Sequence, residues 1–330
     1  PELCAESSAL VARIPLPVDE AARAANIEVE DRLAAAKAEE RAGQDETALE
    51  RLTGLASEAR ELGYPPTLAE VLIVKGHVES SLGHAEEAES SFREAFGAAE
   101  QGRDDRAGAV SAGNLMWVTG YLLNQLEEAE RWSELAEAKI ERLGGDDSIA
   151  ADYLDSRASV LVRAGRNGEA VEVQKRAVEL HSKIEGPDSL DTAMVMTTMG
   201  NVLSNIGEYR EAIEYYEQSL ELKEALVGPN HPTLGFTLTS LSQAYAIFGE
   251  YDKATELARR AVAIFEKVFG PDDPQLATPL NNLAYSLEGL EQYDEARAMH
   301  ERSMEIVAES WGPDHFQMAI NLLNLSSLEK

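Results

Sequence analysis

The stretch "FGPDDPQLATPLNNLA", residues 269–284, begins with helix-breaking residues and ends with two adjacent asparagines in a segment of helical pattern. Its Gly-Pro-Asp opening belongs to a series that recurs every 42 residues. Glycine permits a left-handed turn after a helix, proline prevents the helix from continuing, and Asp, Asn or Ser caps the next helix. The series therefore predicts helix-to-helix connectors in a repeat array. Its members are Gly144-Gly145-Asp146, Gly186-Pro187-Asp188, Gly228-Pro229-Asn230, Gly270-Pro271-Asp272 and Gly312-Pro313-Asp314.

A second series, of alanines, lies between the connectors at spacings of 40 to 42 residues. Its pattern is G-x-Y-x-x-A, as in "GEYREA" at 207–212 and "GEYDKA" at 249–254. Each unit therefore reads as helix A, a tight turn, helix B and a connector. Small residues such as Gly76, Gly200 and Ala284 recur before the turn, where they let the two helices approach closely. The alanines are Ala48, Ala88, Ala129, Ala170, Ala212, Ala254 and Ala296.

The order of small residue, Tyr, Ala and small residue resembles the tetratricopeptide repeat. The 42-residue period, the "FGPDDP" connector and the "NNLA" segment resemble the kinesin light chain type of that repeat. The resemblance is specific for residues 187–330 and looser for 64–186. It implies an all-α fold, a right-handed superhelical solenoid of antiparallel helix pairs.

The repeat register divides the chain. The unit at 103–144 is irregular, because Trp117 stands at the small position and the turn glycine is missing. At Pro279 we expect the first residue of a helix, with Thr278 as its cap, because proline is tolerated there. The expected segments are a linker segment at 1–18, a degenerate helix pair at 19–63, repeats at 64–102, 103–144, 145–186, 187–228, 229–270 and 271–312, and a final half repeat or cap at 313–330.

The charge balance limits the partners. The chain has 29 basic and 60 acidic residues, a formal charge of −31, which repels nucleic acid and anionic membrane surfaces. Cys4 is the only cysteine, so an internal disulfide is excluded and a reducing, cytoplasmic compartment is favoured. No apolar run approaches the roughly 20 residues that cross a bilayer. Because the chain starts at Pro1 without methionine, we expect it to be part of a longer polypeptide.

Catalytic and metal-binding motifs are absent from the sequence. There is no G-x-x-x-x-G-K-[ST], G-x-S-x-G or H-E-x-x-H, no protein-kinase catalytic string, and no pair of histidines at i and i+4. The many carboxylates are typical of solvated helix faces. We therefore expect no catalytic residues, no metal, no cofactor and no enzymatic activity in this chain.

Polar residues recur on helix A. Asn282 lies two residues before the small Ala284, and Asn324, Ser240 and Thr198 hold the same place in other units. In tetratricopeptide domains the asparagine at this place faces the concave groove and bonds the backbone of a bound peptide. The resemblance implies that role for Asn282 and Asn324. The full candidate set is Asn282, Asn324, Asn281, Tyr285, Gln243, Ser240, Asn201, Thr198 and, with a one-residue offset, Asn114.

Two interpretations of this polar face stay open. An amide has both donors and acceptors, which suits an extended peptide backbone. Alternatively, the polar residues form a ladder between adjacent A helices that stiffens the solenoid. The face lacks a lysine and arginine pair for a C-terminal carboxylate, so we expect an extended protein or peptide segment that is neutral or basic.

The order of features suggests a parent protein. A segment with a lone cysteine, degenerate helical units, "RLGGDDS" and then regular units resembles the region after the kinase domain of bacterial serine/threonine protein kinases, especially those of myxobacteria. That resemblance implies a regulatory or substrate-docking array. The alternative is the ligand- or peptide-sensing repeat region of a bacterial transcription regulator.

Overall fold

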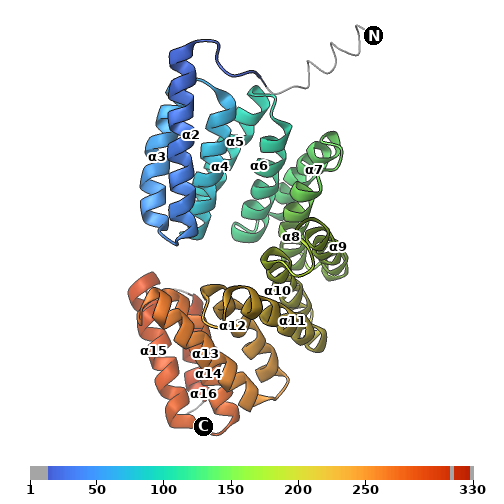
Figure 1. Ribbon diagram of the computed structural model, residues 1–330. Coiled ribbons are helices and arrows are strands. Elements are labelled where there is room, and N and C mark those ends of the chain that lie inside the picture. Colours follow the sequence, from blue (N-terminus) through green and yellow to red (C-terminus); the bar gives the residue numbers. More distant parts are fainter. Residues whose placement is uncertain (1–13, 313–315, 328–330) are drawn as a thin grey trace. The chain divides into compact units, whose positions relative to one another are not determined.

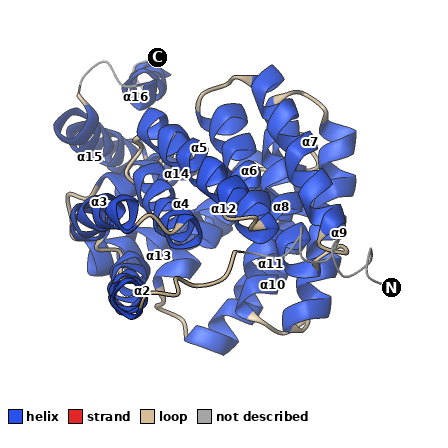
Figure 2. Cartoon of the chain, turned by 90° about the horizontal axis from the view of Figure 1, so that it is seen from above, coloured by secondary structure: helices blue, strands red, loops and turns tan. Residues whose placement is uncertain are grey.

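The computed structural model describes residues 14–312 and 316–327, which form helices joined by turns and loops (Figures 1 and 2). No strand occurs within these two ranges, as an all-α repeat array requires. The chain divides into two compact units, Pro1–Leu180 and His181–Lys330, which are described separately. The division falls within helix α9 (Asn167–Glu185).

Unit 1 consists of antiparallel helix pairs. Helix α4 packs against α5 and α6 packs against α7, while α4 and α8 both contact α6. The even-numbered helices are the expected A helices. The helices of unit 1 before α9 are α2 (Glu20–Arg41), α3 (Asp45–Leu62), α4 (Pro65–Ser81), α5 (Ala85–Gln101), α6 (Asp105–Trp117), a π-helical segment (Val118–Leu122), α7 (Leu126–Arg142) and α8 (Asp147–Arg163).

Unit 2 repeats the same arrangement. The pairs are α10 with α11, α12 with α13, and α14 with α15, and the A helix α12 also contacts α10 and α14. The helices are α10 (Leu190–Asn205), α11 (Tyr209–Val227), α12 (Pro232–Ile247), α13 (Tyr251–Phe269), a 3-10 turn (Pro274–Leu276), α14 (Ala277–Gly289), α15 (Tyr293–Trp311) and α16 (Phe316–Ser327).

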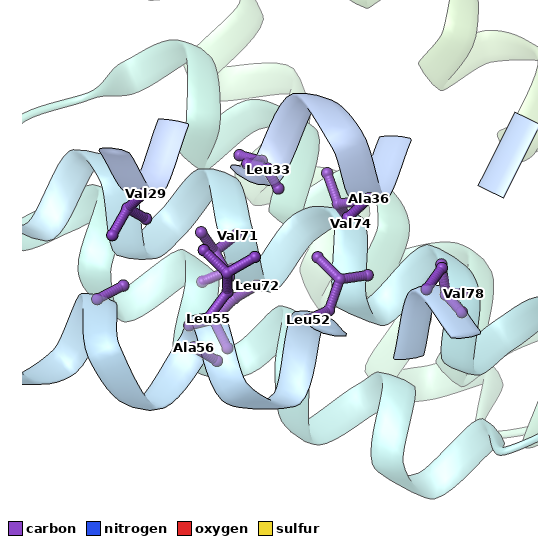
Figure 3. Packing of buried hydrophobic residues seen from close by; sticks show 13 residues of the cluster. Val29, Leu33, Ala36, Leu52, Leu55, Ala56, Val71, Leu72, Val74 and Val78 are labelled. Carbon is purple, nitrogen blue, oxygen red and sulfur yellow. The ribbon is translucent and has the colours of Figure 1, made fainter. Parts of the chain in front are cut away.

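The core follows the repeat. All seven alanines of the second series are fully buried, which confirms that they mark the contact between paired helices. Around them pack larger residues, such as Leu33, Leu52 and Leu72 from three successive helices of unit 1 (Figure 3). Gly76 and Gly200 are predicted small positions that face a ring from helix B. A Cβ at Gly76 would lie 2.6 Å from Phe92 Cε1, and one at Gly200 would overlap the Tyr216 ring.

The connectors form as predicted. Gly144, Gly186, Gly228, Gly270 and Gly312 all have positive φ, a region that L side chains avoid. Asp146 caps α8 by accepting bonds from Ser148 N and Ile149 N. In the next two connectors the cap moves one residue later, to Ser189 and His231.

In two of the repeats, an arginine of helix B bonds to the connector that precedes the pair. Arg260 of α13 donates from Nη1 to Glu224 and from Nη2 to the carbonyl oxygen of Pro229, the latter at 2.7 Å. Because the guanidinium is a rigid fork, one side chain can hold the end of a helix and its connector together. The same pattern recurs one repeat later with Arg302, Glu266 and Pro271.

The irregular unit at 103–144 differs from the regular repeats at the small position and at the turn between its helices. Trp117 ends α6 and is followed by a π-helical turn, in which Gly120 packs closely: a Cβ there would lie 2.6 Å from Val160 Cγ1 of α8 and 2.9 Å from Ala129 Cβ. Asn124, with φ of 57°, supplies the left-handed residue in place of the missing glycine.

The expected start of helix α14 was wrong. The helix begins at Ala277, two residues before Pro279, and Thr278 is inside it. A 3-10 turn precedes it, capped by Asp273, whose carboxylate accepts from Gln275 N at 2.9 Å. Pro279 is still tolerated, because the first four N–H groups of a helix have no intrahelical partner.

Candidate functional site

Five predicted site residues meet in one cavity of unit 2. The cavity has a volume of about 180 Å³ and lies where the A helices α12, α14 and α16 supply its walls. We call it the amide pocket. Its lining residues are Gln243, Ala246, Ile247, Asn281, Asn282, Tyr285 and Asn324.

Two asparagines of the pocket link neighbouring A helices. Asn282 is only 8% exposed, and its Nδ2 donates to the carbonyl oxygen of Thr239 on α12 at 3.1 Å. Asn324 Nδ2 of α16 donates to Asn281 Oδ1 of α14 at 3.0 Å. Within each pair the two residues are 43 positions apart in the sequence, which is one repeat plus one residue. These are the contacts that a polar ladder between A helices would make.

The exposed side of the pocket is different in chemistry. Tyr285 is 43% exposed, Ile247 is 44% exposed, and Gln243 is exposed as well. Together they offer an aromatic ring, an aliphatic side chain and a free-standing amide to a ligand. An aromatic side chain gives a large contact area, while the amide supplies donors and an acceptor.

The other predicted residues do not line the amide pocket. Thr198 and Ser240 are half-buried on α10 and α12. Asn201 is exposed, and its Oδ1 accepts a bond from Tyr216 Oη at 2.8 Å. Asn114 belongs to unit 1, where its Nδ2 lies 2.8 Å from His77 Nε2 and where it lines another cavity.

Sequence reasoning missed the apolar part of the pocket. Ile247 follows Gln243 by one helical turn, so it lies on the same side of α12. An exposed isoleucine at the end of a helix is a weak signal in a sequence. Ala246, which also lines the pocket, was missed as well, because a small buried side chain gives no functional signal in a sequence.

A buried cation lies beside the A helices of unit 2. Lys223 Nζ donates to Thr197 Oγ1 and to Thr237 Oγ1, each at 2.8 Å. Burial lowers the pKa of this ammonium to about 8, because the charged form loses hydration. In the next repeat the equivalent residue is Phe265, which is buried. Lys223 therefore places a polar group where the next repeat has a buried phenyl ring.

Metal and membrane features are both lacking in the described parts of the chain. There, no group of three or more His, Cys, Asp or Glu side chains is placed to hold a metal ion. Across the same residues, no helix has the length and apolar character needed to cross a membrane.

Similar solved structures share the fold. A Signal Transduction ATPase with Numerous Domains protein with a tetratricopeptide repeat sensor, from Pyrococcus horikoshii, has a TM-score of 0.63 and 18% identity; the match covers 85% of this chain and 40% of that one. A Rap protein complexed with Competence and Sporulation Factor has a TM-score of 0.57 and 15% identity, over 92% and 98%. The apo quorum sensor NprR from B. thuringiensis has a TM-score of 0.59 and 13% identity, over 90% and 80%.

The sequence itself matches a known repeat family. Four overlapping matches to a Tetratricopeptide repeat model cover residues 149–225, 198–267, 233–307 and 275–329, more than half of the chain together. A second Tetratricopeptide repeat model matches residues 69–101. No curated protein matches the sequence. With its alternating A and B helices and their buried alanines, the chain belongs to the tetratricopeptide repeat family.

Proposed function

We propose that the chain is a non-catalytic scaffold that binds an extended peptide along the A helices of unit 2, with the amide pocket as the main contact. The observation that carries this proposal is the meeting of Gln243, Asn281 and Tyr285, from two helices, in one cavity. Proteins of this repeat family act as scaffolds for protein interaction.

The ladder contacts assist binding, since they orient the amides. Asn324 occupies the acceptor of Asn281, which leaves Asn281 Nδ2 as a donor for a peptide carbonyl. One hydrogen of Asn282 Nδ2 is used by Thr239, which leaves Oδ1 as an acceptor for a peptide N–H. Side chains that are held by such bonds lose less freedom on binding. Ladder and peptide site are therefore compatible.

The partner is expected to be a neutral or basic segment. The chain carries a formal charge of −31, which favours basic partners and disfavours acidic ones at long range. Tyr285 and Ile247 favour an apolar or aromatic side chain next to the peptide backbone contacts.

For the parent protein we propose a cytoplasmic bacterial serine/threonine protein kinase, in which this array regulates the enzyme or docks its substrate. Its support is the order of sequence features before the regular units. The alternative is a peptide- or ligand-sensing region of a transcription regulator, favoured by the shared fold with a quorum sensor. The complete gene separates the two: a kinase catalytic domain supports the first, and a DNA-binding domain supports the second.

Peptide selection tests the proposed site. A random peptide library displayed on phage is selected against the chain, and the affinity of the best peptide is measured by calorimetry. The double variant Gln243→Ala, Tyr285→Ala is expected to bind at least tenfold more weakly. The matched control is Gln218→Ala, Tyr293→Ala, which removes the same exposed residue types elsewhere in unit 2. Equal loss in both variants, or no selectable peptide, would contradict the proposal.

A further inference from the structure

A second cavity lies wholly within unit 1. It has a volume of about 200 Å³ and is walled by the A helices α4, α6 and α8. We call it the His77 pocket. Its lining combines apolar side chains with an imidazole, an amide, a carboxylate and a hydroxyl. The lining residues are His77, Ala109, Val110, Gly113, Asn114, Ile149, Asp152, Tyr153 and Ser156.

Gly113 keeps this cavity open. A glycine inside a helix costs stability relative to alanine, so it calls for a reason. Gly76 and Gly200 have one, because an aromatic ring occupies the place of their Cβ. At Gly113, which is buried in the middle of α6, an added Cβ would meet only Tyr153 Cδ2, at 3.8 Å, an ordinary van der Waals contact. Helix packing therefore does not require glycine at position 113. The missing side chain instead leaves space in the His77 pocket.

The polar groups that line the pocket are mainly acceptors. Asn114 Nδ2 donates to His77 Nε2 at 2.8 Å, so the imidazole accepts there and Asn114 Oδ1 remains an acceptor. Burial lowers the pKa of His77, which keeps the ring neutral at pH 7. Asp152 is exposed and adds a carboxylate, and Ser156 adds a hydroxyl.

Two other groups near the pocket are accounted for. The Tyr153 hydroxyl donates to Glu137 Oε1 at 2.7 Å and lies 2.6 Å from Ser133 Oγ, so it is already bonded. The charge of Lys37 on α2 helps to lower the pKa of His77, but Lys37 is not among the lining residues. The charged side chain that lines the cavity is therefore Asp152.

We propose that the His77 pocket binds a guanidinium or ammonium group on a short apolar stem, such as an arginine or lysine side chain. The cation contacts Asp152, Ser156 and Asn114 Oδ1, and the stem lies against Val110 and Ile149. The size is suitable, since a cavity of about 150 Å³ holds benzene. This site is separate from the amide pocket, and its occupation does not require peptide binding in unit 2.

The test uses N-acetyl-arginine amide as the probe and N-acetyl-citrulline amide as its neutral analogue. Binding is followed by calorimetry and by the His77 ring resonances in NMR. Two variants remove the proposed contacts: Asp152→Asn takes away the charge, and Gly113→Val fills the space. Their matched controls are Asp31→Asn, an exposed carboxylate on α2, and Gly54→Val, an exposed helical glycine on α3. Thermal unfolding checks that each variant is folded.

The proposal expects the arginine probe to bind at least tenfold more tightly than the citrulline probe. Asp152→Asn and Gly113→Val each weaken it at least tenfold, and both controls bind as the wild type does. If Gly113→Val fails to fold, Asp152→Asn decides alone. Equal binding of the two probes, no binding of the arginine probe, or full binding by Asp152→Asn overturns the proposal.

A further arm distinguishes the source of the cation. A pentapeptide with one central arginine is compared with N-acetyl-arginine amide. Tighter binding of the peptide assigns the pocket to a side chain of a protein partner, and equal binding assigns it to a free small cation. Either result supports the cation site itself. Because both probes act on unit 1, loss of the amide pocket by Gln243→Ala, Tyr285→Ala leaves these results unchanged.

Discussion

Asn282 Nδ2 donates a hydrogen bond to the carbonyl oxygen of Thr239, 3.1 Å away on the preceding A helix. The amide that the repeat pattern assigns to peptide recognition is therefore also a link between repeats. Asn282 is nearly buried, whereas Gln243 and Tyr285 in the same pocket are exposed. Asn282 thus contributes to stability as well as to the proposed site, whereas Gln243 and Tyr285 contribute to the proposed site alone.

Removing the Asn282 amide is expected to lower stability. Asn282→Ala deletes the bond to Thr239, whose carbonyl oxygen keeps the bond from Ser242 Oγ. The free energy of unfolding should therefore fall by about 1 kcal/mol. Urea unfolding monitored by circular dichroism measures this loss. Gln243→Ala, which deletes an exposed amide of the same pocket, is the control and should stay within about 0.5 kcal/mol of the wild type. A destabilisation shared equally by both variants would show that the Thr239 bond has no special role.

The same substitution at two glycines should have opposite effects. At Gly200 an added Cβ overlaps the Tyr216 ring, so Gly200→Ala should destabilise unit 2 by about 1–3 kcal/mol. At Gly113 the Cβ makes only an ordinary contact, at 3.8 Å from Tyr153 Cδ2, so Gly113→Ala should stabilise the protein by about 0.5–1 kcal/mol. Thermal unfolding of the two variants compares the signs. A stabilising Gly200→Ala would refute the packing assigned to the ring.

Lys223 predicts a pH dependence of stability. Burial lowers its folded-state pKa to about 8, while an unfolded lysine titrates near about 10.4. Between these values the unfolded chain binds more protons, so the free energy of unfolding rises with pH in that window. The penalty of burying the charge is fully present below about pH 8. Its full size is on the order of 3 kcal/mol, since each pKa unit corresponds to about 1.4 kcal/mol.

The variant Lys223→Met isolates this effect. Its stability relative to the wild type should be highest at pH 7 and should fall by on the order of 3 kcal/mol as the pH approaches about 10.5. Urea unfolding at several pH values measures the difference. Lys253→Met, which removes an exposed lysine of the same unit, controls for the loss of one charge. A difference between Lys223→Met and the wild type that does not change with pH would contradict a desolvated ammonium at Lys223.

The repeat period predicted much of the fold because it records local contacts that recur. The buried alanines and the left-handed glycines both occur where the 42-residue register places them. What it missed depends on how residues distant in the sequence pack against one another. Gly120 makes its close contacts with Val160 and Ala129 from a π-helical turn that the repeat pattern does not predict. The bond from Arg260 to the Pro229 carbonyl recurs in Arg302 and Pro271, but it joins residues 31 apart, and the period alone does not show that the two residues meet.

The candidate site was predicted in part for the same reason. The polar positions on helix A follow the register, so the repeat pattern alone is enough to group Gln243, Asn281 and Tyr285. Their meeting with Ile247 in one cavity depends on how the helices pack, as does the use of the Asn282 donor by Thr239. Peptide binding by these residues, and the identity of the parent protein, stay predictions.

The central claim is that a peptide contacts the Gln243 and Asn281 amides of the amide pocket. It is tested most directly by NMR of the side-chain amide groups while a library-selected peptide is titrated into the protein. The Gln243 and Asn281 amide resonances should shift and saturate with the peptide, and the exposed Gln218 amide on α11 should not move. Saturable binding that leaves the Gln243 and Asn281 amides unchanged would contradict the claim.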